Sequence, residues 1–372
     1  MKILEMCMFS AGIDGVFTRV REEAIRLSKN NEVRIFSSNI TKGTNEIAPR
    51  EENIGRVKIR RFPAVKLGGE SYMAFDSSLK QAITEYKPKI IIAHSYRHTH
   101  THIALSIGKK IGAKVILVSH GPFGDSSQRS FLGKISVWYY DKFIGPEKLK
   151  KFDKVVAVTK WEIPYLKKLC VSENQLEYIP NGIPEGFFSQ KKGREENKVL
   201  FLGRIAQVKD VETLIRSIKL TRNYIRLEIV GPAEKWYLEK LKRLIDQLEL
   251  KDRVEFSPAV FDIKEKIAKI DSSRIFVLPS KREAMPQSLI EAMARKKIVI
   301  ASDTLGAKDL IKDGENGFLF KIGDSQELAD KIDLAHFLDK NKDAQMRKSA
   351  LNSVKQFSWD NVIKKIERLV RS

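Results

Sequence analysis

The sequence has few cysteines and no long apolar run. Cys7 and Cys170 are the only cysteines among 372 residues, so no disulfide framework is expected and a reducing compartment fits. No segment reaches the roughly 18 consecutive apolar residues that indicate a membrane-spanning helix. The apolar start, MKILEMCMFSAG, is interrupted by Glu5 and predicts a buried strand rather than a signal peptide. We therefore expect a globular, cytoplasmic protein.

Several recognition signatures are also missing, although the chain is strongly basic. There is no helix-turn-helix, zinc-finger or RNA-binding motif, no G-x-G-x-x-G and no Asp-x-Asp pair at a predicted strand end. The chain nevertheless carries 68 Lys and Arg against 47 Asp and Glu, a net charge of +21. Such a surplus predicts an anionic partner, which charge alone leaves open among phosphorylated substrates, an anionic membrane surface and nucleic acid. Nucleic acid is not expected.

The length and the apolar pattern predict two α/β domains. Short apolar runs alternate with amphipathic segments along the chain, which is typical of doubly wound, mostly parallel sheets. The polar segment SQKKGREEN, residues 189–197, is interpreted as a linker. We predict Rossmann-like domains over 1–188 and 198–355, the first for an acceptor and the second for a donor. A helix within 356–372 is expected to pack back toward the first domain.

Ligands in such sheets bind beyond the carboxyl ends of the strands, so loops that follow strands are the place to look for function. The expected strands are 2–8, 32–37, 57–61, 90–94, 115–119, 154–158, 176–179, 198–202, 226–230, 253–256, 275–278, 298–301 and 317–320. The expected helices include 18–29, 77–86, 211–219, 236–248, 289–295 and 359–370.

The segment VLFLGRIAQVKD, residues 199–210, is a strand that runs into a loop with one glycine and two cations. Gly203 permits close backbone approach, and Arg204 and Lys209 precede a helix that Asp210 can cap. Cations above a helix N-terminus suit a diphosphate. A solvated loop with surface charges is the alternative.

The segment VLPSKREAMPQSLIEAMA, residues 277–294, places two carboxylates around a helix start. Pro286 suits the first helical position, so backbone amides there can bind an anion. Glu291 lies more than one turn into the helix and can accept hydrogen bonds from a ribose diol. Glu283 precedes the helix and can reach sugar hydroxyls. The alternative is two exposed acids beside an ordinary cap.

Five segments occur in an order and spacing that resemble one family: FLGRIAQVKD, EIVGP, RVEFSPAV, LPSKREAMPQSLIEAMA and ASDTLGAKDLIKDGENGFLF. The chain resembles the retaining GT-B glycosyltransferases of family 4, the "glycosyl transferases group 1" set. The resemblance covers nearly the whole chain, is strongest over 199–320 and includes the E-x7-E motif. It implies a GT-B fold, in which two Rossmann-like domains face a central cleft.

The resemblance implies a role for each of these positions. Arg204 and Lys209 would bind the donor diphosphate and stabilise the leaving nucleotide. Glu291 would hold the ribose, and Glu283 would contact the transferred sugar. Backbone after the 253–256 strand would read the base, and amides at the helix start would meet phosphate or sugar; these further donor contacts are Pro258, Val260, Met285, Pro286, Gln287 and Ser288. Many relatives carry Gly-Leu or Gly-Val at 286–287, which leaves the donor's identity open.

Two segments of the first domain complete the resemblance. In FSAGIDGVFTRVREEAIRLSK, residues 9–29, Gly12 and Gly15 would let the backbone approach the donor phosphate and sugar. In ILVSHGPF, residues 116–123, His120 would contact the donor sugar at the reaction centre. Without the resemblance, a single histidine at a strand end is more often structural.

The segment HSYRHTHTH, residues 94–102, holds four of the six histidines. A metal site, a catalytic site or a plainer role are the alternatives. The segment is expected to enter a helix after its strand, which scatters the rings, and no Asp, Glu or Cys lies nearby in sequence to complete a tetrahedral site. We predict no metal here but an acceptor-side loop, with His94 and His98 as contacts.

Residues 123–154 mix aromatic and basic side chains. Such a stretch suits an anionic membrane interface or a lipid-phosphate acceptor. A surface helix with its aromatic face on the core is the alternative, and we expect it for the aromatics, with the cations facing a membrane. The residues concerned are Phe131, Trp138, Tyr139, Tyr140, Phe143, Arg129, Lys134, Lys142, Lys148, Lys150 and Lys151.

The expected activity is that of a retaining hexosyltransferase. It would move a sugar from a UDP- or GDP-linked donor to a hydroxyl of a glycan or lipid-linked acceptor, with catalytic roles for His120, Glu283, Arg204 and Lys209. No cofactor or metal is expected, and the cytoplasmic enzyme could contact a membrane peripherally. A nucleotide-sugar epimerase of the same fold, a basic nucleic-acid-binding protein and a metallohydrolase built on the histidine segment are the alternatives.

Overall fold

The computed structural model describes residues 1–372 except 13, 45, 68–71, 124–129, 190–193, 223 and 372. The chain divides into two compact units: Met1–Pro180 with Val362–Ser372, the first unit, and Asn181–Asn361, the second unit. Residues 181–188, which the sequence analysis assigned to the first domain, belong to the second unit because Ile183 and Phe187 lie in its core. Part of the expected linker, 190–193, and the basic residue Arg129 lie outside the described residues.

The first unit is built on an eight-stranded sheet in the order β10-β9-β8-β7-β1-β2-β4-β3. All neighbouring strands are parallel except β3 and β4. A separate hairpin pairs β5 (Ala64–Lys66) with β6 (Met73–Phe75). The strands of the large sheet are β1 (Lys2–Phe9), β2 (Glu32–Ser38), β3 (Glu51–Ile54), β4 (Val57–Phe62), β7 (Ile90–His94), β8 (Lys114–Val118), β9 (Lys154–Ala157) and β10 (Leu176–Tyr178).

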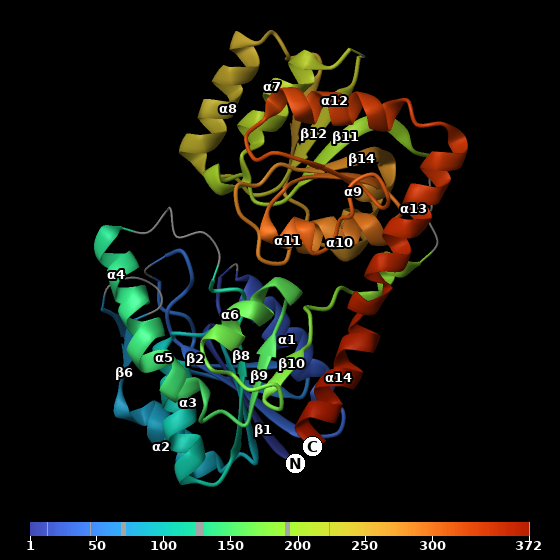
Figure 1. Cartoon of the computed structure of the whole chain (residues 1–372). Coiled ribbons are helices and arrows are strands. Elements are labelled where there is room, and N and C mark those ends of the chain that lie inside the picture. The colour runs from blue at the N-terminus through green and yellow to red at the C-terminus, as the bar shows by residue number, and fades with distance from the viewer. Residues whose placement is uncertain are drawn as a thin grey trace. The chain divides into compact units, whose positions relative to one another are not determined.

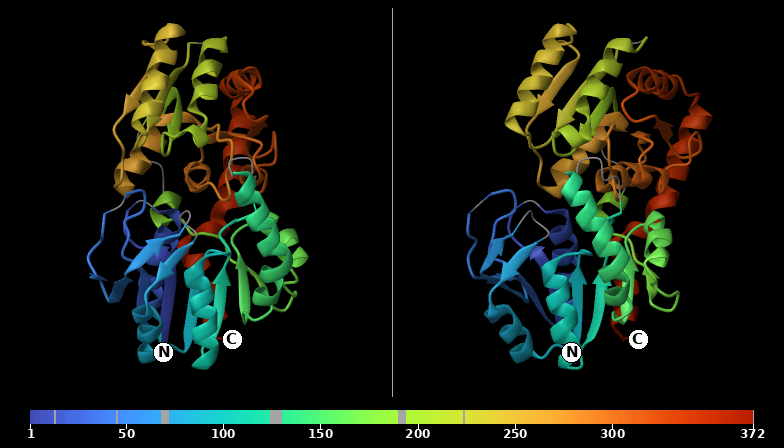
Figure 2. Two further views of the ribbon diagram at one scale, coloured as in Figure 1. Left: turned by 90° about the vertical axis from the view of Figure 1, so that its left-hand side faces the viewer. Right: turned by 60° about the vertical axis from the view of Figure 1, so that its left-hand side comes forward.

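Helices cover both faces of this sheet (Figures 1 and 2). Leu4 and Met6 of β1 face the core formed with α2 and α3. Because side chains alternate along a strand, Glu5 points to the opposite face, against which α1 packs. The helices of the unit are α1 (Gly15–Leu27), α2 (Ser77–Tyr86), α3 (Thr99–Lys110), α4 (Phe131–Tyr139), a π-helical turn (Tyr140–Ile144), α5 (Gly145–Leu149), α6 (Ile163–Lys168) and the end of α14 (Trp359–Arg371).

The second unit has an all-parallel, six-stranded sheet in the order β13-β12-β11-β14-β15-β16. Figure 1 shows α7, α8 and α12 over one face and α10 over the other. The strands are β11 (Glu196–Leu202), β12 (Arg226–Val230), β13 (Val254–Ser257), β14 (Ser273–Leu278), β15 (Ile298–Ser302) and β16 (Phe318–Phe320). The helices are α7 (Val211–Leu220), α8 (Lys235–Gln247), α9 (Ile263–Ser272), α10 (Gln287–Ala294), α11 (Leu305–Lys308), α12 (Ser325–His336) and α13 (Lys340–Val354).

Aspartate side chains start several of these helices. The caps of α1, α2, α9, α12 and α13 are aspartates whose carboxylates accept hydrogen bonds from backbone amides of the first turn. Asp210, which the sequence predicts as the cap of α7, does not act in this way. It has a left-handed backbone with φ of 48° and its side chain caps no amide. Its carboxylate instead accepts a hydrogen bond from the Thr213 hydroxyl at 2.8 Å.

The aromatic side chains around α4 are largely exposed, which contradicts the expectation that they pack on the core. No residue of α4 is buried, and only Tyr140 of the aromatics predicted to pack is buried. The apolar side of α4 is therefore not packed against the core of the first unit. The exposed apolar residues of the segment are Phe131, Leu132, Ile135, Trp138, Tyr139 and Phe143. Among the described residues no helix is long and apolar enough to cross a membrane.

A substitution at Gly231 tests how closely the loop after β12 packs against the loop that carries Gly203. It follows β12 with φ of 149°, and a Cβ atom there would lie 1.9 Å from the carbonyl oxygen of Gly203. We expect Gly231→Ala to lower the free energy of unfolding by about 3 kcal/mol, because the loop that carries Gly203 must move. Gly314→Ala is the control, since Gly314 has φ of 79° with no atom near its Cβ position. It should lose only about 1–2 kcal/mol in urea denaturation; equal losses would contradict the close packing.

Candidate active site

The first group of predicted residues meets where the strand order of the second unit reverses. β11 and β14 are neighbours, and their connections lead to opposite sides of the sheet order. Loops at the carboxyl ends of such a pair form the usual ligand site of doubly wound sheets. Lys209 follows β11 and Glu283 follows β14, and their Nζ and Oε1 atoms lie 2.6 Å apart. The Ser280 hydroxyl donates to the same carboxylate oxygen at 2.6 Å.

The helix α10 begins beside this ion pair. The sequence predicts Pro286 as the first helical residue. In the structure Pro286 is instead the N-cap, and Gln287 is the first helical residue. No side chain caps the amides of the first turn. These amides carry the positive end of the helix dipole, which favours an anion. Met285 is fixed just before the helix, where its sulfur accepts a hydrogen bond from the Asn181 amide at 3.3 Å.

Glu291 is buried rather than exposed, so the alternative of two exposed acids is wrong for this residue. Its side chain lies against Lys266 of α9, with the Nζ and Oε2 atoms 2.5 Å apart. Burial raises the pKa of Glu291, and the charge of Lys266 opposes that rise. Sequence analysis missed Lys266, because only the packing of α9 and α10 on the same sheet brings the two together.

The remaining predicted donor contacts lie in loops that follow strands of the second unit or in the first turn of α10. The side chain of Arg204 is 57% exposed, with its guanidinium 3.3 Å from Glu234. Pro258 and Val260 follow β13, and Val260 packs against the core of the second unit. Ser288 lies in the first turn of α10. Arg204 is thus accessible to a bound anion.

The glycines of the first unit have different surroundings. Gly12 has φ of 84°, and a Cβ atom there would lie 2.7 Å from the backbone oxygen of Lys42. A larger residue at this position would therefore collide with the backbone of Lys42. Gly15 starts α1 and has no atom within 4 Å of its Cβ position. Asp14 between them caps α1 and pairs with the Lys42 amine at 2.7 Å.

His120 occupies a strained turn after β8. Its φ is 60°, and Ser95 and Arg97, after the neighbouring strand β7, also have positive φ. Non-glycine residues in this region cost roughly 1–3 kcal/mol each and persist only where neighbours hold them. The buried carboxylate of Glu162 does so at the turn of His120. It accepts hydrogen bonds from the Ser119 hydroxyl at 2.7 Å and from the Gly121 amide.

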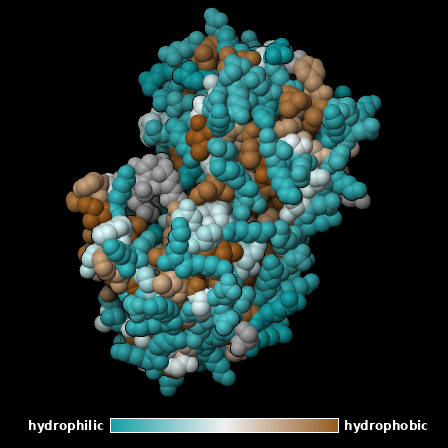
Figure 3. All heavy atoms as spheres, viewed as in Figure 1, coloured by the Kyte–Doolittle hydropathy of each residue, from teal (hydrophilic) through white to brown (hydrophobic). Residues whose placement is uncertain are grey.

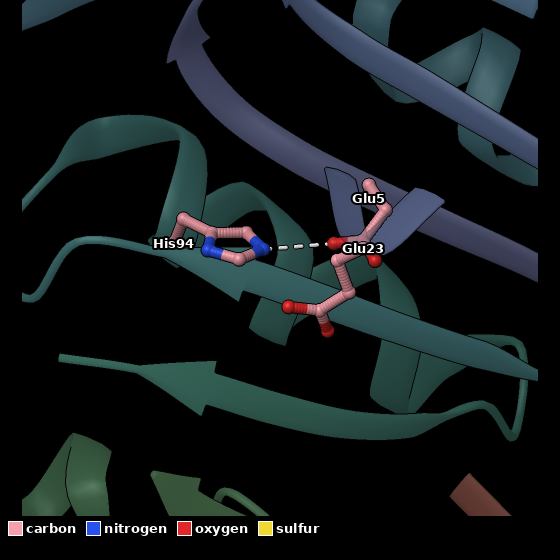
Figure 4. A group of neighbouring side chains, drawn as sticks. All are labelled: Glu5, Glu23 and His94. Carbon is pink, nitrogen blue, oxygen red and sulfur yellow. Dashed lines mark hydrogen bonds and ion pairs between the residues drawn. The ribbon is translucent and has the colours of Figure 1, made fainter. Parts of the chain in front are cut away.

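His94 is fully buried and both of its ring nitrogens are engaged. Nδ1 lies 2.9 Å from Nε2 of His120, and Nε2 lies 2.8 Å from a carboxylate oxygen of Glu5 in β1 (Figure 4). An acceptor cannot touch this ring, so the structure does not support the predicted direct contact of His94. The expectation that no acid lies near the segment fails in space, because Glu5 comes from a strand 89 residues earlier.

The other histidines of the segment have structural partners. His98 is the N-cap of α3, with Nδ1 3.0 Å from the Tyr96 carbonyl oxygen. His100 bonds the His94 carbonyl oxygen at 2.7 Å, and Nε2 of His102 lies 2.9 Å from the Tyr140 hydroxyl. The segment enters a helix as predicted, but the rings are not all scattered, because the ring centroids of His98 and His100 lie 5.7 Å apart.

One group of metal-ligand type is close enough to hold an ion among the described residues: Glu5, Glu23 and His94. Arg19 already supplies the positive charge in this place, with Nε 3.2 Å from the Glu23 carboxylate, and both side chains are buried. A second cation beside a buried guanidinium would be repelled. We therefore assign the group no metal.

Comparisons with known proteins identify the family to which the chain belongs. The family model "Glycosyltransferase Family 4" matches residues 13–186, and the model "Glycosyl transferases group 1" matches residues 183–353. Together they span nearly the whole chain, which belongs to the group 1 glycosyltransferases. The expected enzyme class, a hexosyltransferase with a GT-B fold, is thereby confirmed.

Relatives and solved structures agree with this assignment. An uncharacterized glycosyltransferase of Methanocaldococcus jannaschii is 29% identical over 96% of this chain and 94% of its own length. A Campylobacter jejuni α-1,4-N-acetyl-D-galactosaminyltransferase acting on an undecaprenol-linked glycan is 27% identical over 78% of this chain and 75% of its own. The fold matches Anabaena HepE in complex with UDP and glucose, with a TM-score of 0.75, 17% identity and coverage of 100% and 99%.

A partly buried histidine makes the stability of the first unit sensitive to acid. Burial, and then the charge of Lys148, lower the pKa of His102 to about 4. In the unfolded chain the value is about 6.5, so the unfolded state binds a proton first and stability is lost as pH falls below about 6.5. Between about pH 7 and about pH 5.5, His102→Gln should lose roughly 1 kcal/mol less than the unaltered protein in urea denaturation. Tyr140→Phe, which removes the hydrogen-bond partner but keeps the imidazole, should retain the full pH dependence.

Proposed function

We propose that the protein transfers a sugar, with retained configuration, from a nucleotide diphosphate sugar to a hydroxyl of a glycan or lipid-linked acceptor. The observation that carries the proposal is the meeting of Lys209, Glu283 and the start of α10 at the strand-order reversal of the second unit. A cation, uncapped helix amides and a sugar-binding carboxylate are the groups that a nucleotide diphosphate sugar requires. Solved relatives of the same fold hold UDP or UDP-glucose.

In this proposal the second unit stabilises the leaving group. Negative charge grows on the diphosphate as the glycosidic bond breaks. Lys209 and the α10 amides are in place before the reaction begins, and the exposed Arg204 side chain is free to turn toward the diphosphate. Glu291 binds the ribose and Glu283 the transferred sugar. Glu283 now pairs with Lys209 at 2.6 Å, and a diphosphate would compete for that amine. His120 of the first unit contacts the transferred sugar.

We also propose that transfer needs no metal ion. Support comes from the positive groups already fixed beside the proposed diphosphate, Lys209 and the first turn of α10. Turnover of the sugar nucleotide should therefore survive treatment with EDTA. Loss of turnover in EDTA with recovery on adding Mn²⁺ would contradict this part alone. An epimerase of the same fold would instead release free sugar and nucleotide without an acceptor, which product analysis detects.

Lys209→Ala should weaken binding of the nucleotide diphosphate by about 10- to 100-fold, because one charge-assisted contact contributes about 1.5–3 kcal/mol. Titration calorimetry with UDP and GDP measures the affinity and also identifies the base. The control is Lys312→Ala, which removes an exposed lysine whose amine lies 3.7 Å from Glu315. Equal affinity for both variants would contradict the diphosphate site.

His120→Ala should lower turnover with little change in nucleotide affinity.

We propose in addition that the apolar side of α4 contacts an anionic bilayer. Figure 3 shows hydrophobic side chains gathered where Figure 1 draws α4. The exposed fractions of Phe131 and Trp138 are 76% and 57%, which is unusual for a contiguous surface group of large apolar residues. Lys142 lies over the ring of Trp138 with its amine 5.0 Å from the ring centre. Aromatics flanked by lysines, in a chain of net charge +21, match a negatively charged interface.

The double change Phe131→Ser with Trp138→Ser tests this contact. It should reduce sedimentation with phosphatidylglycerol-containing vesicles at least tenfold, because each buried aromatic contributes about 1.5–3 kcal/mol. The control is Trp236→Ser, which removes a tryptophan of α8 that is 54% exposed. Equal binding of the unaltered protein to neutral phosphatidylcholine vesicles would contradict the electrostatic part. A dimer that the double change dissolves would mean that a second copy covers the surface.

A further inference from the structure

A buried chain of hydrogen bonds leads from the middle of β1 to His120. The Glu5 carboxylate lies 2.8 Å from His94 Nε2, and His94 Nδ1 lies 2.9 Å from His120 Nε2. Glu5 and His94 are completely buried, whereas His120 is partly accessible. Its other ring nitrogen, Nδ1, has no hydrogen-bond partner among the described residues. The chain therefore ends on one nitrogen that a ligand can meet.

Charge balance decides which groups in this chain carry protons. Glu23 lies beside Glu5 (Figure 4), and Arg19 is the cation next to them, bonded to Glu23. Two ionised carboxylates and one guanidinium would leave a net negative charge in the interior, which is expensive. One bound proton makes the group neutral. Burial raises the pKa of Glu23 too, against the opposing charge of Arg19. Only Glu23 has the ion pair with Arg19, so we assign the proton to Glu5.

The second oxygen of Glu5 supports the same assignment. This atom, Oε1, is buried without a hydrogen-bond partner. An unpaired carbonyl oxygen of a neutral acid costs far less than an unpaired oxygen of a carboxylate. Burial, followed by the charge of Glu23, raises the pKa of Glu5 well above its usual value, against the opposing effect of Arg19.

Both imidazoles in the chain are neutral. Burial is the main cause that lowers the pKa of His94 and of His120. Besides His94, the groups that face His120 are Arg19, His98 and His100, and the charge of each of these three disfavours a positive charge on His120. A neutral imidazole has one N–H and one acceptor nitrogen, so the proton on Glu5 fixes the direction of every hydrogen bond that follows.

We propose that Glu5 and His94 are positioning residues that hold His120 as its Nδ1–H tautomer. The Glu5 hydroxyl donates to His94 Nε2, and His94 Nδ1–H donates to His120 Nε2. The remaining nitrogen of His120 is then an N–H donor. This inference rests on the proposed function, in which His120 contacts the transferred sugar: there the ring donates a hydrogen bond to a sugar oxygen and does not act as a base. An ionised Glu5 would reverse each bond and make the same nitrogen an acceptor.

Nitrogen NMR of the histidine-labelled protein without ligand tests the tautomer directly. We expect protonated Nδ1 and unprotonated Nε2 in both His94 and His120, with His94→Gln and His120→Gln used to assign the signals. A protonated Nε2 on either ring would overturn the proposal. This measurement needs neither substrate nor activity. An Nδ1–H tautomer in a protein that turns over no nucleotide sugar would therefore refute the proposed function while the hydrogen-bond order stands.

Two changes at Glu5 separate positioning from folding. Glu5→Gln places an amide N–H₂ where the acid hydroxyl donates, so the tautomers and kcat should remain within about threefold of the unaltered enzyme. Glu5→Leu is similar in size but has no donor. It should mix the tautomers and lower kcat at least tenfold, with nucleotide affinity unchanged. Equal kcat in the Leu and Gln variants, both folded by their melting curves, would contradict a positioning role. If the Leu variant does not fold, the spectrum of the unaltered protein still decides.

Discussion

The reversal of strand order in each sheet is the constraint on which the proposed chemistry depends. β1 and β7 meet at the reversal of the first unit, and β11 and β14 meet at that of the second. Connections leave such a pair toward opposite sides, so the loops at the carboxyl ends diverge and leave room for a ligand. The residues with proposed roles in binding or catalysis lie at or after the carboxyl ends of these strands. Lys209 and Glu283 follow the second pair, and His94 ends a strand of the first.

Both units place ionisable side chains in the protein interior beneath these loops. Glu291, and Glu5 with His94, are buried where apolar residues of similar size would pack without loss of hydration, while Lys266 is partly exposed. Replacing buried hydrogen-bonded or charged groups by well-packed apolar residues is often neutral or stabilising. Stability therefore does not explain these groups. Their position next to the proposed substrate contacts does, because buried groups of fixed orientation need no rearrangement when charge develops.

Sequence reasoning predicted most strands, the start of α10 to within one residue, the loop position of Glu283 and the helical position of Glu291, because apolar runs and helix signals are local. It missed partners that only tertiary structure brings together. No residue near His94 in the sequence indicates its contact with Glu5, and no residue near Glu291 indicates its contact with Lys266. The assumption that Asp210 caps α7 failed for a related reason. The cap pattern was present, but the backbone before the helix turned into the left-handed region and directed the carboxylate elsewhere.

The segment around α4 shows a further limit of sequence patterns. Apolar residues at helical spacing indicate that one side of a helix is covered, and the same spacing serves a protein core, a second subunit or a lipid surface. The choice among these depends on what lies beside the helix in the folded chain. Phe131 and Trp138 remain exposed, so in the proposed membrane contact the covering material comes from outside the described residues. The lysines interleaved with these aromatics then favour an anionic surface over an apolar protein face, because burying lysine against protein without a paired carboxylate is unfavourable.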